Sequence, residues 1–374
     1  MKIGVPKETV SGETRVAATP ETVGKLRAKG FEVCVQRGAG EWACYGEAAY
    51  EAAGAQLVDA KEALAADLVV KVRAPTLEEA RGLKGGSVLC ALLEPCESTE
   101  LLKHLAEANV TALALEAIPR TTRAQAMDVL SSQANIAGYR AVIEGASRYV
   151  RFFPMMMTAA GAARPARVVV LGAGVAGLQA IATARRLGAE VEAFDVRPAV
   201  KEEVQSLGAK FIELDLGESG AGEGGYAREL TAEAKERQQQ ALTQYLQKAN
   251  VIISTALIPC RPAPVLITEQ AVKGLVDGAV IVDMAAANGG NCVLTKADQV
   301  VTAHGVTILG FTNYPALVAA DASAFFARNM LNLVSILVDS QEGTVSLKDF
   351  TQDDISRAAM VTYQGKVLYQ LPQV

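Results

Sequence analysis

The sequence predicts an α/β protein with two doubly wound parallel-sheet domains. Short strands rich in β-branched residues alternate with helices along most of the chain, which is typical of a parallel sheet covered on both faces. The 374 residues are about two and a half times the length of a typical domain, so two domains are expected. Half of the residues are hydrophobic and 21% are charged, which is enough apolar material for two large cores.

The first third of the chain begins this alternation. Thr19 is a good N-cap and precedes a proline at the first helical position, so a helix is expected from Pro20 to about Ala28. Further strands are expected at residues 2–5, 31–36, 68–72, 87–92 and 110–115, and further helices from about 77 and at 98–108. A long helix without proline should follow over residues 124–148 and bridge the two domains.

The second domain should contain six strands, expected at residues 168–171, 190–195, 210–214, 250–254, 279–283 and 306–309. An apolar helical stretch over 319–340 is expected to return to the first domain. The predicted division is therefore 1–128 with 312–374 for the first domain and 129–311 for the second.

A glycine motif opens the second domain. Gly172, Gly174 and Gly177 form a G-x-G-x-x-G pattern that follows a valine-rich strand and begins a helix, the context that a Rossmann dinucleotide-binding turn requires. The amide groups at the helix N-terminus would bind the phosphates. Asp195 ends the second strand, where a carboxylate binds the adenosine ribose and repels a 2′-phosphate, so NAD(H) is expected rather than NADP(H). Arg197, two residues later, weakens this preference.

Two other segments contain candidate functional residues. Residues 216–226 read LGESGAGEGGY, which is too rich in glycine to pack and favours either a mobile lid over a ligand or a tolerated surface insertion. Residues 119–128, with Ser131 and Ser132, place polar side chains near the presumed domain junction. There Asp128 could orient a nicotinamide ring, or it could cap the long helix and pair with an arginine. The residues alone weigh these two roles equally.

Composition excludes several other functions. The net charge is −5 with dispersed basic residues and few aromatics, which argues against nucleic-acid binding. The six cysteines form no C-x-x-C pair and the two histidines lie far from them, so no metal site is expected and the cysteines should be buried free thiols in a reducing cytoplasm. Neither histidine has the neighbours of a catalytic triad. No secretory signal or membrane span is expected.

The residues resemble those of proton-translocating NAD(P)⁺ transhydrogenases, in the NAD(H)-binding first domain of the alpha subunit, and more distantly those of alanine dehydrogenases. The resemblance covers essentially the whole chain, through KIGVPKE, GETRVAATPETV, SSQANIAGYRAV, PMMMTAAG, VLGAGVAGLQAIATA, GGYARE, STALIP, PAPVLIT and VDMAAANGGNC. It implies two Rossmann-like domains with a cleft between them and a homodimer. It also implies hydride transfer between NAD(H) on this chain and NADP(H) on a partner component. A membrane component would conduct protons, so the chain would lie on the cytoplasmic side of the inner membrane through its partners.

The resemblance also implies roles for individual residues. Arg120, Asp128 and Ser131 would hold the nicotinamide end of NAD(H), and Gln125 would reach toward the partner's NADP(H). Tyr226 would belong to a mobile loop near residues 216–230. The further nucleotide contacts, with those of the glycine motif and Asp195, would be Val175, Val196, Arg197, Gly225, Gln238 and Leu257.

Two other functions are weighed against this one. An alanine dehydrogenase would keep Arg15 as a carboxylate-binding residue, but the lysine and histidine that act on its substrate fall on Arg73 and Glu94, which leaves no evident general acid–base. A non-enzymatic NAD(H)-binding module would bind nucleotide without transferring hydride. The intact set of Arg120, Gln125, Asp128 and Ser131 argues against that function.

Overall fold

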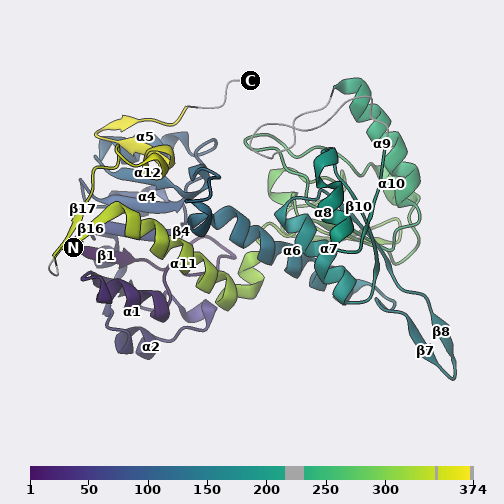
Figure 1. Cartoon of the computed structure of the whole chain (residues 1–374), viewed down its shortest axis with the longest axis horizontal. Coiled ribbons are helices and arrows are strands. Elements are labelled where there is room, and N and C mark those ends of the chain that lie inside the picture. Colours follow the sequence, from purple (N-terminus) through teal and green to yellow (C-terminus); the bar gives the residue numbers. More distant parts are fainter. Residues whose placement is uncertain (215–230, 342–343, 371–374) are drawn as a thin grey trace. The chain divides into compact units, whose positions relative to one another are not determined.

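The computed structural model describes residues 1–214, 231–341 and 344–370 (Figure 1). The chain forms two compact units. The first comprises Met1–Gln133 and Pro315–Val374, and the second comprises Ala134–Tyr314. Helix α6 (Val129–Arg148) runs from the end of the first unit into the second. No helix in the described ranges is long and apolar enough to cross a membrane.

The first unit is built on an eight-stranded sheet. Its strand order is β3-β2-β1-β4-β5-β6-β18-β19, and the six strands from β3 to β6 are parallel. The strands are β1 (Lys2–Val5), β2 (Glu32–Gln36), β3 (Gln56–Val58), β4 (Leu68–Arg73), β5 (Val88–Leu92), β6 (Thr111–Ala114), β18 (Met360–Tyr363) and β19 (Lys366–Val367). The C-terminal hairpin β18–β19 adds to β6 in the antiparallel direction, so segments from both ends of the chain share one sheet.

Helices cover both faces of this sheet. Alternate residues of each strand point to opposite faces, so Leu68 and Val70 lie in one core cluster and Val69 in another. The first face packs against α1 (Pro20–Ala28), α2 (Glu47–Ala52), α11 (Ala319–Leu337) and α12 (Asp354–Ala359), and the second against α3 (Ala60–Leu64), α4 (Leu77–Arg81) and α5 (Thr99–Glu107). A further hairpin, β16 (Val338–Gln341) and β17 (Thr344–Leu347), follows α11. The expected helix to residue 340 therefore ends at Leu337.

The second unit has a seven-stranded sheet in the order β11-β10-β9-β12-β13-β15-β14. All neighbours are parallel except β14 and β15. The strands are β9 (Arg167–Leu171), β10 (Glu190–Phe194), β11 (Lys210–Phe211), β12 (Val251–Ser254), β13 (Val280–Asp283), β14 (Val300–Ala303) and β15 (Val306–Leu309). Helices α6, α7 (Val175–Arg186) and α8 (Lys201–Ser206) cover one face, and α9 (Ala232–Leu246) and α10 (Glu269–Lys273) cover the other. A separate hairpin, β7 (Met156–Thr158) and β8 (Gly161–Ala163), projects from this unit (Figure 1).

The parallel strands of each unit follow the order 3-2-1-4-5-6 of a Rossmann-like sheet, with β14 added in the antiparallel direction at the edge of the second sheet, which confirms the predicted fold class. Two further expectations about local structure and chemistry are wrong. Helix α6 begins at Val129 and not near residue 124, because the Asp128 side chain accepts a hydrogen bond from the Ser131 amide and so ends the preceding 3-10 turn, Gln125–Met127. Cys34, Cys90 and Cys292 are buried free thiols, but the free thiol of Cys44 is exposed, and Cys96 and Cys260 are disulfide-bonded rather than free.

Candidate functional site

The glycine turn lies between β9 and α7. Gly172 has a φ of 99°, and a Cβ there would lie 2.6 Å from Thr255 Oγ1. A Cβ on Gly177 would lie 1.8 Å from the carbonyl oxygen of Gly172. A Cβ on Gly174, in contrast, would have no neighbour within 4 Å. The first and third glycines are therefore required by packing, and the second keeps the backbone open to an approaching group.

The N-terminus of α7 can receive that group. Gly174 is the N-cap residue, and no side chain makes a capping hydrogen bond there. Val175, the first helical residue, is exposed. The first amide groups of α7 point out of the helix with the positive end of its dipole, so the turn fits the pyrophosphate of a dinucleotide.

Asp195 lies directly after β10, beside the same turn. Its Oδ2 accepts a hydrogen bond from the Ala173 amide at 2.7 Å. Arg197 donates to the carboxylate from its backbone amide at 2.9 Å and from Nε and Nη2 at 2.9 and 2.8 Å. The guanidinium thus neutralises the carboxylate that the sequence assigned to ribose binding, and the pair raises the pKa of Arg197. Val196, between them, packs against the core of the second unit.

Two residues that the sequence analysis missed organise the neighbouring strand ends. Asp283 is completely buried and accepts hydrogen bonds from the Ala285 and Cys292 amides and from Thr295 Oγ1 at 3.0, 2.9 and 2.6 Å. Asn291, also completely buried, bonds both the amide and the carbonyl of Ala256, at 3.1 and 2.8 Å. Asn291 thus holds the segment after β12, in which Thr255 donates a hydrogen bond to the Gly172 carbonyl, and Asp283 holds the segment after β13 that contains Asn291. The signal was available, because an acid ends a buried strand in VDMAAANGGNC and an asparagine follows two glycines.

The other predicted nucleotide-binding residues of the second unit lie on different segments of the chain. Leu257 follows β12 in the segment that Asn291 supports and is 44% exposed. Gln238 lies on the buried face of α9. Gly225, Tyr226 and the predicted lid at 216–226 lie outside the described residues.

The second predicted cluster lies in the first unit, at the start of α6. Asp128 Oδ1 accepts a hydrogen bond from the Ser131 amide at 2.8 Å, and Oδ2 accepts one from Ser131 Oγ at 2.5 Å. Asp128 therefore caps α6, which is part of one of the two roles that the sequence analysis gave it. It uses only two of about four acceptor positions on the carboxylate, so Asp128 can still accept a further hydrogen bond. Arg120 and Gln125 lie in the loop before it, and both are exposed.

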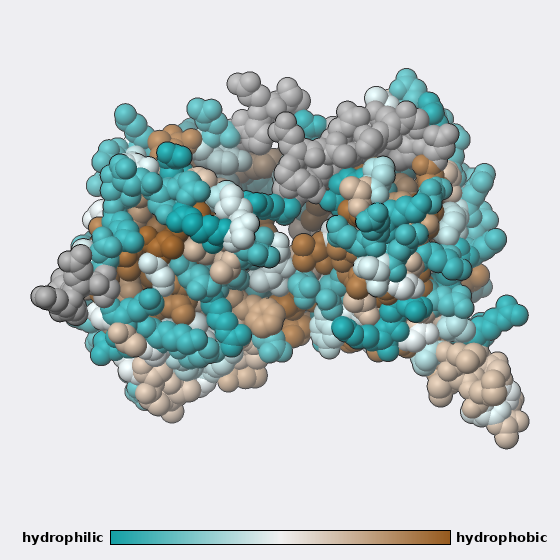
Figure 2. Space-filling model, in the orientation of Figure 1, coloured by the Kyte–Doolittle hydropathy of each residue, from teal (hydrophilic) through white to brown (hydrophobic). Residues whose placement is uncertain are grey.

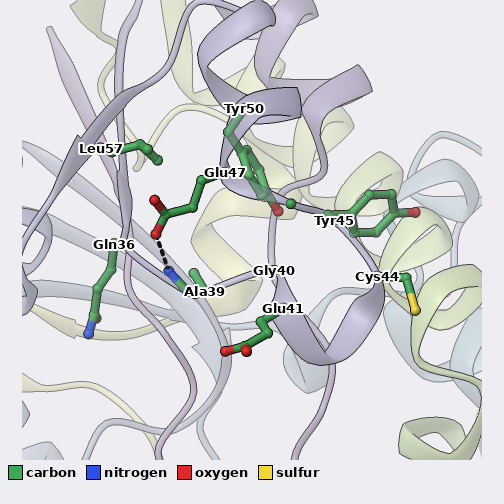
Figure 3. Close-up of a pocket in the computed structure, with 11 residues that line it drawn as sticks. Gln36, Ala39, Gly40, Glu41, Cys44, Tyr45, Glu47, Tyr50 and Leu57 are labelled. Carbon is green, nitrogen blue, oxygen red and sulfur yellow. Dashed lines mark hydrogen bonds between the residues drawn. The ribbon is translucent and has the colours of Figure 1, made fainter.

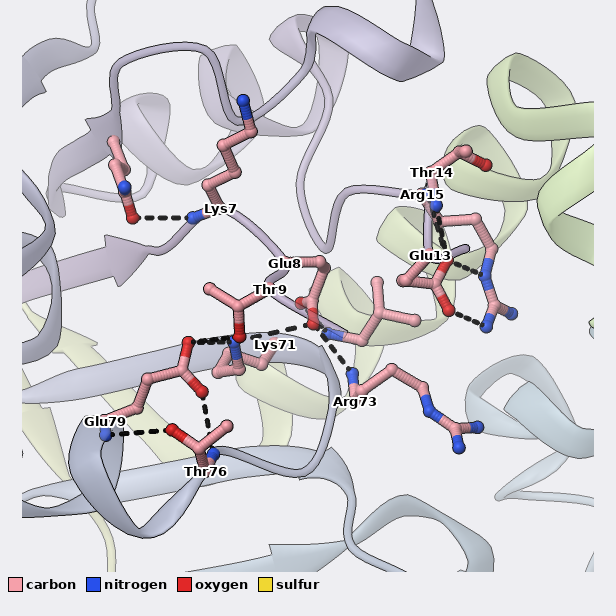
Figure 4. Close-up of polar contacts among 12 residues, drawn as sticks. Lys7, Glu8, Thr9, Glu13, Thr14, Arg15, Lys71, Arg73, Thr76 and Glu79 are labelled. Atoms are coloured by element: carbon pink, nitrogen blue, oxygen red, sulfur yellow. Dashed lines mark hydrogen bonds and ion pairs between the residues drawn. The ribbon is translucent and has the colours of Figure 1, made fainter. Parts of the chain in front are cut away.

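Two sets of charged side chains in the first unit, one of them buried, bear on the alanine dehydrogenase alternative (Figure 4). Arg15 donates from Nε and Nη2 to the two oxygens of Glu13 at 2.8 and 2.7 Å, and from Nη1 to Gln133 at 2.8 Å. Arg15 is 4% exposed. Arg73 and Glu94 form an ion pair of 2.8 Å. The arginine expected to bind a substrate carboxylate is therefore neutralised within the protein.

A shallow cavity of about 510 Å³ lies beside α2 and contains none of the predicted site residues (Figure 3). Its acidic side chains already have partners. Glu47 accepts from the Gly38 amide at 3.1 Å and pairs with Arg37, and Glu41 pairs with Lys7. Within the described ranges, no group of three or more His, Cys, Asp or Glu side chains could hold a metal ion.

The fold and the glycine turn define a two-unit Rossmann-like protein with a dinucleotide-binding motif in its second unit. The chain belongs to the alanine dehydrogenase/PNT family, since the family's N-terminal domain matches residues 4–137 and its C-terminal domain matches residues 141–370. It is 49% identical over 378 residues to the first part of the NAD(P) transhydrogenase alpha subunit of Rhodospirillum rubrum, covering 99% of this chain and 98% of that one. Alanine dehydrogenase of Halomonas elongata is 31% identical over 99% of this chain and 95% of its own.

Solved structures of the same two kinds of protein are similar to this chain. The crystal structure of transhydrogenase from Sinorhizobium meliloti has a TM-score of 0.86 at 41% identity, with 99% of each chain covered. An L-alanine dehydrogenase has a TM-score of 0.82 at 26% identity, covering 99% of this chain and 97% of its own. Within its family, the chain is therefore more similar to these transhydrogenases than to these alanine dehydrogenases.

Proposed function

We propose that this chain is the NAD(H)-binding subunit of a proton-translocating NAD(P)⁺ transhydrogenase. The observation that carries the proposal is the likeness over the full length to transhydrogenase alpha subunits, at 49% identity in one case. The glycine turn supports it, because Gly174 leaves room for a pyrophosphate at the N-terminus of α7. The reaction is hydride transfer between NAD(H) bound by this chain and NADP(H) bound by a partner component.

The residues of this chain would bind and orient the nucleotide rather than exchange protons with it. The amides at the start of α7 bind phosphate, and Asp195 binds the adenosine ribose once its contacts with Arg197 rearrange. Arg120, Asp128 and Ser131 hold the nicotinamide end, and Gln125 reaches toward the partner's nucleotide. Tyr226, Gly225, Gln238 and Leu257 complete the predicted contacts. Hydride transfer requires two carbon atoms held at contact distance with water excluded, so positioning supplies most of the catalysis.

Partner components belong to this proposal. The likeness to a subunit implies an NADP(H)-binding component and a membrane component that conducts protons. It would place this chain on the cytoplasmic side of the inner membrane through those partners. A homodimer is supported by the hairpin β7–β8 and the residues before it, where Val150, Phe152, Met155 and Met157 are 76, 56, 64 and 75% exposed. Figure 2 shows this projection as a pale brown surface. Apolar side chains gathered on a projecting arm favour burial against a second copy.

Hydride transfer is the direct test of the proposed function. The chain is mixed with an NADP(H)-binding component of a transhydrogenase, and hydride transfer from NADPH on that component to an NAD⁺ analogue bound by this chain is followed by absorbance. Gln125→Asn should lower turnover about tenfold with little change in NADH affinity, because the shortened amide no longer reaches the partner. Asp195→Asn, the matched variant at the other end of the nucleotide, should instead weaken NADH binding. No stimulation over either protein alone would contradict the assignment, and activity with L-alanine and NAD⁺ alone would favour the alanine dehydrogenase function.

The dimer has its own test. Met155→Asp with Met157→Asp should place two charges on the apolar arm and shift the chain from dimer to monomer in sedimentation equilibrium at micromolar concentration. The melting temperature should stay within a few degrees of that of the parent, since both side chains are exposed. A parent chain that sediments as a monomer, or a variant that stays a dimer, would contradict this element of the proposal.

A further inference from the structure

The loop before Asp128 is held by hydrogen bonds from helix α11. The carbonyl oxygen of Ala126 accepts from Asn329 Nδ2 at 2.8 Å and from Asn332 Nδ2 at 3.0 Å. The two asparagines are three residues apart, so they share one face of α11. A carbonyl oxygen has two lone pairs, and these two donors use both. The backbone between Gln125 and Asp128 is therefore fixed by side chains from a segment some 200 residues later in the chain.

Asn329 makes a second contact that reaches the far side of Asp128. Its Oδ1 accepts a hydrogen bond from Ser132 Oγ at 2.7 Å. Ser132 lies in the first turn of α6, next to Ser131, which binds both carboxylate oxygens of Asp128. One amide thus connects the loop before Asp128 to the helix after it.

Apolar contacts alone would not set this geometry. Ala124 and Met127 are buried in the same core cluster as Phe326 and Met330 of α11, and they determine how deeply the loop sits. Gln125 and Ala126, between them, are exposed. The direction of the exposed backbone is specified by the directional bonds of the two asparagines, because dispersion contacts have little angular preference.

We propose that Asn329 and Asn332 are positioning residues for hydride transfer, acting through the carbonyl of Ala126 on Gln125 and Asp128. The inference rests on the proposed function. Neither asparagine contacts the reacting atoms in this role. They hold the loop so that Gln125 and Asp128 meet the two nicotinamides in the reactive arrangement, for which a displacement of about 1 Å can cost on the order of 100-fold in rate.

The test uses Asn329→Ala, Asn332→Ala, Asn329→Asp and the double alanine variant in the mixed transhydrogenase assay. We expect turnover to fall about tenfold in Asn329→Ala and about threefold in Asn332→Ala, because the first loses two contacts and the second one. The double variant should lose more than either alone. Dissociation constants for NADH should stay within about twofold of the parent. Asn329→Asp keeps the volume and the acceptor for Ser132, but it replaces the donor with a carboxylate oxygen that the Ala126 carbonyl repels, so it should be as slow as Asn329→Ala.

The control is Ser335→Ala on the same helix. The Ser335 hydroxyl donates to the carbonyl of Leu331 within α11, so its loss should leave turnover unchanged. Parental turnover in the double variant would overturn the inference. So would a loss of turnover matched by an equal loss of NADH affinity and a lower melting temperature, which marks a purely structural role. A parent chain that transfers no hydride refutes the proposed function instead, before the variants are compared.

Discussion

The two units share one strand order but differ in the segment after their first strand. In the second unit β9 leads into the glycine turn, where a Cβ on Gly174 would touch nothing within 4 Å. In the first unit β1 leads into a segment that carries Glu8, Glu13 and Arg15, all of them buried. The place where a Rossmann-like sheet opens to a ligand is thus kept open in one unit and occupied by charged side chains in the other.

The buried charged side chains of the first unit are paired with one another (Figure 4). The Lys71 ammonium, on a residue 1% exposed, lies 3.5 Å from Glu8 Oε2 and 3.1 Å from Glu79 Oε1. Glu8 also accepts a hydrogen bond from the Val72 amide at 2.6 Å, so the segment after β1 is tied to β4. Topology therefore decides where a site can form, and the local residues decide whether one does.

The largest effect on stability is expected from removing the cation of this buried charged group. Lys71→Met leaves two carboxylates buried without their cation and should lower the free energy of unfolding by about 3–5 kcal/mol. Lys84→Met is the control, since its pair with Asp67 is exposed and worth no more than about 1 kcal/mol. Urea denaturation measures both. NADH binding should survive in folded Lys71→Met, because the glycine turn belongs to the other unit. Equal stabilities of the two variants would contradict the comparison.

The next largest effects are expected on NADH binding, from alanine substitutions in the glycine turn. Gly177→Ala must displace the carbonyl of Gly172 and should abolish detectable NADH binding and cost about 1–3 kcal/mol of stability. Gly174→Ala meets no neighbour, so it should leave the melting temperature unchanged and weaken NADH binding by about tenfold, roughly 1.4 kcal/mol. Fluorescence titration with NADH and thermal unfolding separate the two variants. If Gly174→Ala bound NADH like the parent, the pyrophosphate would not approach this turn.

The smallest expected effect is a change in the stability of the first unit with pH. Burial raises the pKa of Glu8 above its ordinary value of 4.5, against the opposing effects of Lys71 and the Val72 amide. The folded chain then holds this proton more tightly than the unfolded chain, so the contribution of Glu8 to stability is fully present below pH 4.5 and is lost as the pH rises through the raised value. The stability of the parent relative to Glu8→Gln should therefore fall as the pH rises above 4.5. Urea midpoints of both proteins between about pH 4 and 8 measure this, and a constant difference would show that Glu8 titrates normally.

Much of the fold was predictable because its signals are local. The six expected strands of the second unit are present, and Thr19 caps α1 with Pro20 at its first position. The strand β14 was missed, because His304 and Gly305, with φ of 52° and 75°, form a two-residue hairpin turn where histidine is an uncommon choice. The start of α6 was misplaced, because residues 124–127 have helical composition and only the capping bond of Asp128 ends the turn.

The sequence by itself determined the two α/β units, the glycine turn and the identity of the candidate residues, because strand–turn–helix patterns are encoded by neighbours along the chain. Only the tertiary structure decided how those residues are held. Three sets of hydrogen bonds depend on where the backbone places each side chain. They join Asp195 to Arg197, Asn291 to Ala256, and Asn329 and Asn332 to Ala126. A hydrogen bond demands a distance and an angle between two groups, and composition and periodicity specify neither.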